Sequence, residues 1–195
     1  MMGGAERRRD GRGIRAAALL LVLLMMAGCS GPRQYVREDA GVRTIKKIAV
    51  LPLASLTADE NAGEKIRGLV ISELLSRGVD VVEPGEVTRA LLEMKVRSLG
   101  ALTVDDFKAL GKRLKVKALM TGSVAAYGMS RGITTTYPEV SIHLMLIDTS
   151  NGEIVWSVWH TAGGPSFWTR HFGTEGLTLS ETARKAVREA IGALL

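Results

Sequence analysis

Apolar residues between position 45 and the C-terminus recur with two different periods. Alternation with a period of two is typical of a strand, and a spacing of three and four residues places apolar side chains on one face of a helix. These periods predict strands at residues 45–53, 79–82, 116–127, 140–147 and 153–160. They predict helices at residues 61–77 and 86–94, a third that opens at Thr103 and a last one that opens at Thr178. The predicted order of elements is therefore β-α-β-α-α-β-β-β-α.

Capping and turn residues support three of these boundaries. Thr103 with Asp106, and Thr178 with Glu181, have the spacing of a capping box, in which a hydroxyl and an acid satisfy free N–H groups where a helix begins. Asn151-Gly152 is typical of a tight turn between antiparallel strands. We therefore expect one α/β domain over residues 45–195. Its mixed sheet of about five strands is flanked by helices and ends in an antiparallel hairpin.

Residues 1–28 have the composition of a leader. They hold five arginines and two acids, so they carry +3 of the net charge of +6. An apolar run follows at residues 16–27, which is shorter than the roughly 20 residues that a helix needs to span a bilayer. A basic start, a short apolar run and small residues before a cut site are typical of a secretory signal peptide.

The end of this leader, Met26-Ala27-Gly28-Cys29, resembles the lipobox of bacterial lipoproteins, with methionine where that family most often has leucine. The resemblance implies cleavage between Gly28 and Cys29, a diacylglycerol on the Cys29 thiol and an acyl chain on its amine. Two or three acyl chains anchor a protein stably to a membrane. Cys29 is the single cysteine, so no intramolecular disulfide can form. Apart from the covalent lipid, no cofactor is expected.

Ser30 follows the lipidated position, where aspartate commonly keeps lipoproteins in the inner membrane. Ser30 therefore resembles the class sorted to the outer membrane, and we expect the domain to face the periplasm. Residues 29–44 are mostly polar, with Gly31-Pro32, Gly41 and mixed charge, which predicts a short tether. Fully extended at roughly 3.3 Å per residue, this tether reaches about 50 Å.

The composition, with 46% apolar and 24% charged residues, is ordinary for a globular protein. No Lys/Arg cluster is interleaved with aromatic residues, so nucleic acid is not an expected partner. Lys112, Arg113, Lys115 and Lys117 form a local basic run. The run is interpreted as a solvated helix end, and an anionic partner such as a lipid head group or a glycan is the alternative.

A search for catalytic constellations finds none. His143, His160 and His171 lack helical spacing and have no cysteine cluster beside them. His143 is expected to be an exposed strand residue, and a metal pair with His160 across the hairpin is the alternative. Asp105 and Asp106 lie at a helix start, where their charge complements the helix dipole. Gly122-Ser123 follows a strand but opens no helix, so no phosphate cradle is expected. We expect no enzymatic activity, no resident metal and no small-molecule substrate.

Five of the chain's nine aromatic residues lie near the C-terminus, namely Trp156, Trp159, Phe167, Trp168 and Phe172. They are interpreted as strand faces and a loop packed back on the sheet. The alternative is that Phe167, Trp168 and Phe172 form an exposed lip that binds a partner or touches the membrane, because aromatic residues are enriched at such contacts.

Three segments together carry a resemblance over residues 45–195: IAVLPL from Ile48, ALMTGSV from Ala118 and LIDTSNGEIVWS from Leu146. They resemble the amino-terminal domain of TolB and the related domains of curli-secretion (CsgG-like) and LpoB-like lipoproteins. The curli-secretion pore needs long inserted strands, and the stretch between the strands predicted at 116–127 and 140–147 is too short for two of them. The LpoB-like activator stands on a long linker, which this chain lacks.

The resemblance implies a non-enzymatic adaptor or an assembly or secretion-related factor of the cell envelope. Its partners would be the membrane, through the lipid, and other envelope proteins. Related domains form rings, which adds homo-oligomerisation to the options. The alternatives are an activator of a peptidoglycan synthase and an envelope hydrolase.

Overall fold

The structure, a computed structural model, describes residues 33–37, 41, 45–132, 136–164 and 176–195, all within one compact unit, Pro32–Leu195. Its strands are β1 (Arg33–Val36), β2 (Lys47–Val50), β3 (Ala54–Ser55), β4 (Asp80–Val81), β5 (Ala118–Arg131), β6 (Thr136–Asp148) and β7 (Ile154–Gly163). Its helices are α2 (Ala62–Ser76), α3 (Pro84–Glu93), the short 3-10 helix η2 (Leu99–Ala101), α4 (Val104–Leu114) and α6 (Leu179–Leu194).

The strands form one mixed sheet in the order β1-β7-β6-β5-β2-β4, with β3 beside β5. β2 is parallel to β4 and to β5, whereas β5, β6, β7 and β1 are antiparallel neighbours. The predicted α/β class, the mixed sheet and the C-terminal hairpin are confirmed. The sheet has seven strands, where about five were expected.

The two additional strands are β1 and β3, which are too short to show a period of their own. β1 lies within the predicted tether. It pairs with β7 from Arg33↔Trp159 to Val36↔Trp156, so residues 33–36 belong to the sheet. The four residues RQYV show no strand pattern in the sequence. They form a strand because they pair with the edge of β7.

β5 and β6 are longer than the sequence pattern predicts, because they pair with each other along their whole length. Their register runs from Ala118↔Asp148 to Arg131↔Thr136, into the stretch between the strands predicted at 116–127 and 140–147. Pro138 is tolerated there because it lies beyond Glu139↔Gly163, the last pair that β6 makes with β7. A strand with a partner on one side only can lack an N–H group.

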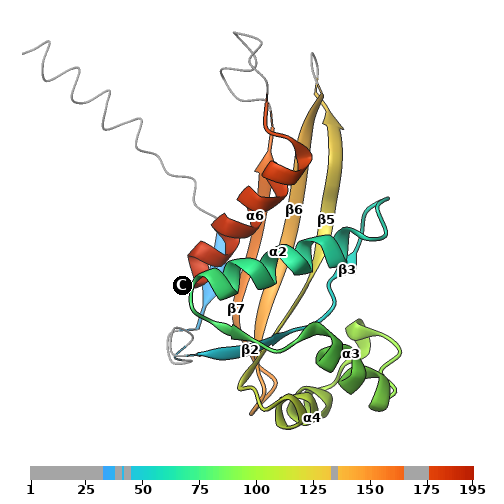
Figure 1. The fold of residues 1–195 in the computed structure, drawn as a ribbon, viewed down its shortest axis with the longest axis vertical. Helices are drawn as coiled ribbons and strands as arrows, with labels where there is room; N and C mark the ends of the chain where they lie inside the picture. The colour runs from blue at the N-terminus through green and yellow to red at the C-terminus, as the bar shows by residue number, and fades with distance from the viewer. Residues whose placement is uncertain (1–32, 38–40, 42–44, 133–135, 165–175) are drawn as a thin grey trace, which may run out of the picture. The chain divides into compact units, whose positions relative to one another are not determined.

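Helices pack on both faces of the sheet. α2 and α6 cover the face of β5, β6 and β7 that carries the main core, as Figure 1 shows. Within that core Trp156, Ile142 and Leu144 are fully buried. α3 and α4 pack on the other face, at one end only, around Leu51, Leu110 and Leu119.

The two helix starts predicted from capping boxes are confirmed in atomic detail, whereas the helix predicted at 86–94 begins at Pro84. The N–H of Thr103 donates to Asp106 Oδ2 at 2.8 Å, and the N–H of Asp106 donates to Thr103 Oγ1 at 3.3 Å. Glu181 and Thr178 repeat the arrangement at the start of α6. These hydrogen bonds stabilise the carboxylates, so the pKa of Asp106 and that of Glu181 are lowered.

Gly122 on β5 gives a test of the β5–β6 register. A Cβ added to Gly122 would lie 2.0 Å from the carbonyl oxygen of His143 on β6, so an alanine would force the strands apart. We predict that Gly122→Ala lowers the free energy of unfolding by at least about 2 kcal/mol, measured by urea denaturation.

Gly128→Ala is the matched control, because it lies on the same strand and a Cβ there would meet nothing within 4 Å. We expect this variant to be within about 0.5 kcal/mol of the wild type. Equal losses of stability in the two variants would contradict the described register.

Candidate functional site

No helix that the structure describes packs on one face of the sheet over its β1–β7–β6 side. Successive residues of β6 point to opposite faces, so Ile142 and Leu144 pack under α2 and α6, while Ser141, His143 and Met145 point the other way. Among the described elements, α3 and α4 cover that second face only near β2 and the start of β5. We call the uncovered part, centred on His143, the open face.

A stacked pair of rings lies at the centre of the open face. His143 and Trp159 are directly opposite each other on β6 and β7, with ring centroids 5.3 Å apart and planes inclined by 30°. His143 Nε2 lies 3.0 Å from Ser157 Oγ. Trp159 remains 51% exposed although it stacks on one side. Tyr35, which is paired with Ser157 across the β1–β7 ladder, is 55% exposed.

The imidazole of His143, at the centre of the open face, favours its neutral form. Partial burial lowers the pKa of His143 below its ordinary value of 6.5. Beside it, the hydroxyls of Ser141 and Thr161 are hydrogen bonded to each other at 2.8 Å. The face therefore presents two exposed aromatic rings among hydroxyl groups that already have partners.

The structure separates the two histidines that were considered as a metal pair. His160 is paired with Ile142 in the register, and its Nε2 lies 2.7 Å from Glu189 Oε2 on α6. His143 lies on the opposite face of the sheet, so the two imidazoles cannot bind one ion. The described part of the chain contains no group of three His, Cys, Asp or Glu side chains that could hold a metal. His143 is half-buried, where an exposed residue was expected.

The two described tryptophans have different roles. Trp156 is fully buried in the core, and its indole N–H has no protein partner, whereas Trp159 is exposed on the open face. The sequence pattern did not distinguish these two tryptophans. It also did not indicate Tyr35 as a surface residue of the sheet, because Tyr35 lies in the predicted tether. Gly28, Cys29 and Ser30 lie outside the described residues, as do Phe167, Trp168, His171 and Phe172. What was expected of them stays a prediction. In the described chain, no helix combines the length and apolarity that crossing a membrane requires.

Comparison with known proteins shows the fold. No protein-family model and no curated protein matches the chain. The PelC dodecamer from Paraburkholderia phytofirmans is similar at a TM-score of 0.57 and 21% identity, over 83% of this chain and 96% of that one. Lipoprotein GNA1162 from Neisseria meningitidis is similar at a TM-score of 0.54 and 20% identity, over 75% of this chain and 98% of that one. The chain thus shares its α/β fold with these two proteins.

The LpoB C-terminal domain from Salmonella enterica is a weaker match. Its TM-score is 0.46 at 15% identity, over 64% of this chain and 86% of that one. A likeness of this size supports no argument about the chain. The resemblance to TolB and to the curli-secretion lipoprotein stays a prediction.

The lowered pKa of His143 makes stability depend on pH. Below pH 6.5, the ordinary pKa of histidine, the unfolded chain binds a proton at His143 that the folded chain does not bind until its lowered pKa is reached. Stability therefore falls as pH is lowered through that window. We predict that His143→Gln removes this part of the acid slope, measured by urea denaturation at several pH values. Wild-type and variant curves that stay parallel over the window would show that burial of His143 does not affect its titration.

Proposed function

We propose that this chain is a lipoprotein anchored to the outer membrane through lipid on Cys29, and that its periplasmic domain is a non-enzymatic assembly component of the cell envelope. The observation that carries the assembly role is the open face, with Trp159 and Tyr35 exposed on neighbouring strands and Tyr35 opposite Ser157, two residues before Trp159. Tryptophan and tyrosine are the residues most often found at the centres of protein interfaces.

The anchor and β1 together support a domain held at the membrane surface. The leader and the lipobox-like segment support lipidation of Cys29, and Ser30 supports sorting to the outer membrane. β1 begins at Arg33, four residues after Cys29. Four extended residues span about 14 Å, so a lipidated chain cannot carry this domain far into the periplasm. This geometry favours partners that are themselves at the membrane.

A second copy of the chain is the partner that we propose for the open face. β1 is the edge strand on this side, and an edge leaves backbone N–H and C=O groups that natural proteins cover. Copies held on one membrane meet at a high effective concentration. PelC, which shares the fold, is a dodecamer, and this supports the proposal without deciding the number of copies here.

Substitution of the exposed indole tests self-assembly. We predict that the full chain in detergent sediments as an oligomer and that Trp159→Ser weakens this association at least about tenfold, measured by analytical ultracentrifugation. Leu92→Ser is the matched control, because Leu92 is 70% exposed on α3, away from the open face. It removes a comparable exposed apolar side chain and should leave the oligomer unchanged.

Two outcomes would contradict self-assembly through the open face. One is a wild-type chain that stays monomeric at all concentrations, and the other is equal weakening by both serine variants. If a monomeric wild-type chain captured a peptidoglycan synthase from native membranes and raised its activity, the activator hypothesis would replace the proposal. Thermal melting of each variant separates lost association from lost folding.

Lipidation is tested separately at Cys29. We predict that mass spectrometry of the mature amino-terminal peptide finds an acylated Cys29 and that Cys29→Ala abolishes both acylation and cleavage after Gly28. Association of the wild-type chain with outer-membrane fractions, lost in the variant, would support the localisation. An unmodified Cys29 in a soluble fraction would overturn the anchor but would leave the self-assembly test valid.

A further inference from the structure

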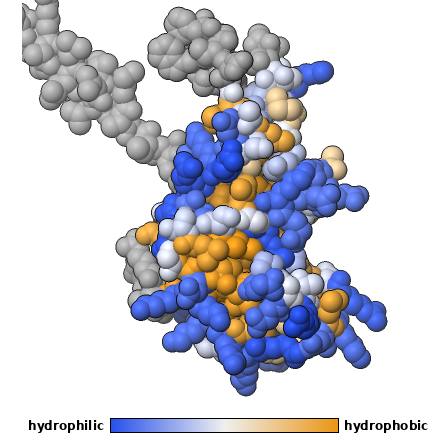
Figure 2. Space-filling model, in the orientation of Figure 1, coloured by the Kyte–Doolittle hydropathy of each residue, from blue (hydrophilic) through white to orange (hydrophobic). Residues whose placement is uncertain are grey.

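Six lysines gather at the end of the domain where β2 and β5 begin. They line two cavities, of about 320 Å³ and 560 Å³, which have Lys115, Val116 and Lys117 in common. We call the two adjoining cavities together the basic groove, and its lysines are Lys46, Lys47, Lys108, Lys112, Lys115 and Lys117. Hydrophilic side chains dominate the visible surface of this end of the domain in Figure 2.

Sheet topology brings these lysines together. β2 and β5 are parallel neighbours paired at Ile48↔Ala118, so the residues that precede the two strands meet at one edge. Lys46 and Lys47 thereby come beside Lys117, and α4 ends directly before Lys115. These segments are far apart in the sequence, which explains why the sequence pattern shows only part of the cluster.

Backbone contacts hold one wall of the groove in place. The N–H of Thr149 donates to the carbonyl of Lys117, and Thr149 Oγ1 donates to the carbonyl of Val116, both at 3.0 Å. The Thr149 side chain packs against Gly111 of α4, where an added Cβ would lie 2.3 Å from it. The turn between β6 and β7 thus fixes the segment that carries Lys115 and Lys117.

The charge of the groove is largely uncompensated. None of its six lysines makes an ion pair with another residue in the described chain, although Arg113 on the same helix pairs with Glu93. The register brings two acids close, Asp80 opposite Lys47 and Asp148 beside Thr149. Asp148 already accepts the N–H of Ser150 at 2.7 Å. The described residues that line the two cavities include six lysines and no acidic side chain.

Lys115 occupies a backbone conformation that favours glycine. It caps α4 with φ 54° and ψ 46°, in the left-handed region that helices commonly reach at a glycine just past their end. A lysine there destabilises the fold relative to glycine, while it adds a charge at the junction of the two cavities. Lys95 has the same kind of conformation, with φ 55°, but lines neither cavity, so it offers a matched control.

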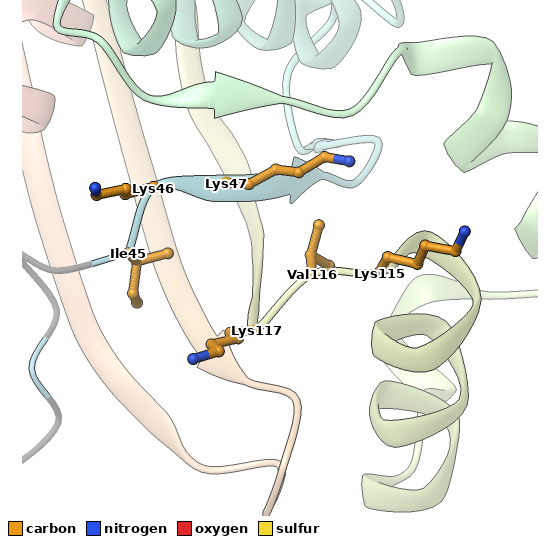
Figure 3. Close-up of a pocket in the computed structure, with 6 residues that line it drawn as sticks. All are labelled: Ile45, Lys46, Lys47, Lys115, Val116 and Lys117. Atoms are coloured by element: carbon orange, nitrogen blue, oxygen red, sulfur yellow. The ribbon is translucent and has the colours of Figure 1, made fainter.

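The arrangement of the amines suggests the shape of the ligand. In Figure 3, Lys46 and Lys117 extend to one side, whereas Lys47 and Lys115 extend to the other. The amines do not converge, so they form no cradle for one small anion. Positive charges spread along a groove match a linear chain with repeated negative groups. A concave groove also fits such a chain better than it fits the flat surface of a bilayer. No aromatic side chain of the described residues lines either cavity, and such side chains are what stack bases of single-stranded nucleic acid.

We propose that the basic groove binds a linear polyanion that carries repeated carboxylate or phosphate groups. This inference depends on neither the lipid anchor nor self-assembly through the open face. The groove is a second surface of the domain, lined by none of the open-face residues. For the basic run at residues 112–117, an anionic partner was the alternative to a solvated helix end. The proposal makes that partner a linear chain of anionic groups.

The test is a calorimetric titration of the full chain in non-ionic detergent micelles with two probes, oligogalacturonate for carboxylates and oligophosphate for phosphates. We expect at least one probe to bind and its affinity to fall about tenfold between about 50 and 200 mM salt, because screening weakens exposed charges. The probe that binds more tightly identifies the anionic group. Lys112→Glu with Lys117→Glu should weaken binding at least about tenfold.

Two glycine variants separate the effect of the lysine charge on binding from its effect on the stability of the fold. Lys115→Gly should raise the melting temperature and weaken binding about threefold. Lys95→Gly should raise the melting temperature in the same way and leave binding unchanged. No binding of either probe at low salt, or equal weakening in both glycine variants, would overturn the proposal. Displacement of the bound probe by phosphatidylglycerol added to the micelles would overturn it in favour of a lipid-headgroup site.

Discussion

The pairing of β5 with β6 is the constraint on which the rest of the structure depends. It runs over the full length of both strands and decides which side chains of β6 face α2 and α6. Because side chains alternate along a strand, a slip of one residue would exchange Ile142 and Leu144 for His143 and Met145 in the core. The close approach of Gly122 to the backbone at His143 holds this register, since no larger residue fits there.

Two surfaces follow from this one register and from the order of the strands. At the antiparallel side, β7 adds to β6 and β1 adds to β7, which stacks Trp159 on His143 and places Tyr35 opposite Ser157 on the same face. At the parallel side, β2 adds to β5 and collects lysines from three separate segments at one edge. The first surface is aromatic and suits another folded domain, and the second is cationic and suits a charged chain. The two proposed roles, self-assembly and binding of a polyanion, therefore use separate surfaces of one domain.

Local chemistry made much of the fold predictable. The starts of α4 and α6 follow from threonines and acids three residues apart, because capping needs only neighbours in the sequence. The turn after Asp148 follows from Asn151-Gly152, and Gly152 does adopt a positive φ of 75°. By contrast, β1 and the outer ends of β5 and β6 were missed, because their order comes from a neighbouring strand and not from their own pattern. The separation of His143 from His160 could not be decided without knowing the register.

The sequence by itself determined the α/β class, the order and approximate bounds of the main elements, and the leader with its lipidation motif as a prediction. All of these depend on residues close together in the chain. The tertiary structure alone decided that Tyr35 lies opposite Ser157 on the open face, that Trp156 is core while Trp159 is exposed, and that Lys46 and Lys47 join the lysines after α4. Such contacts join residues separated by more than 60 positions, and only strand pairing and burial bring them together.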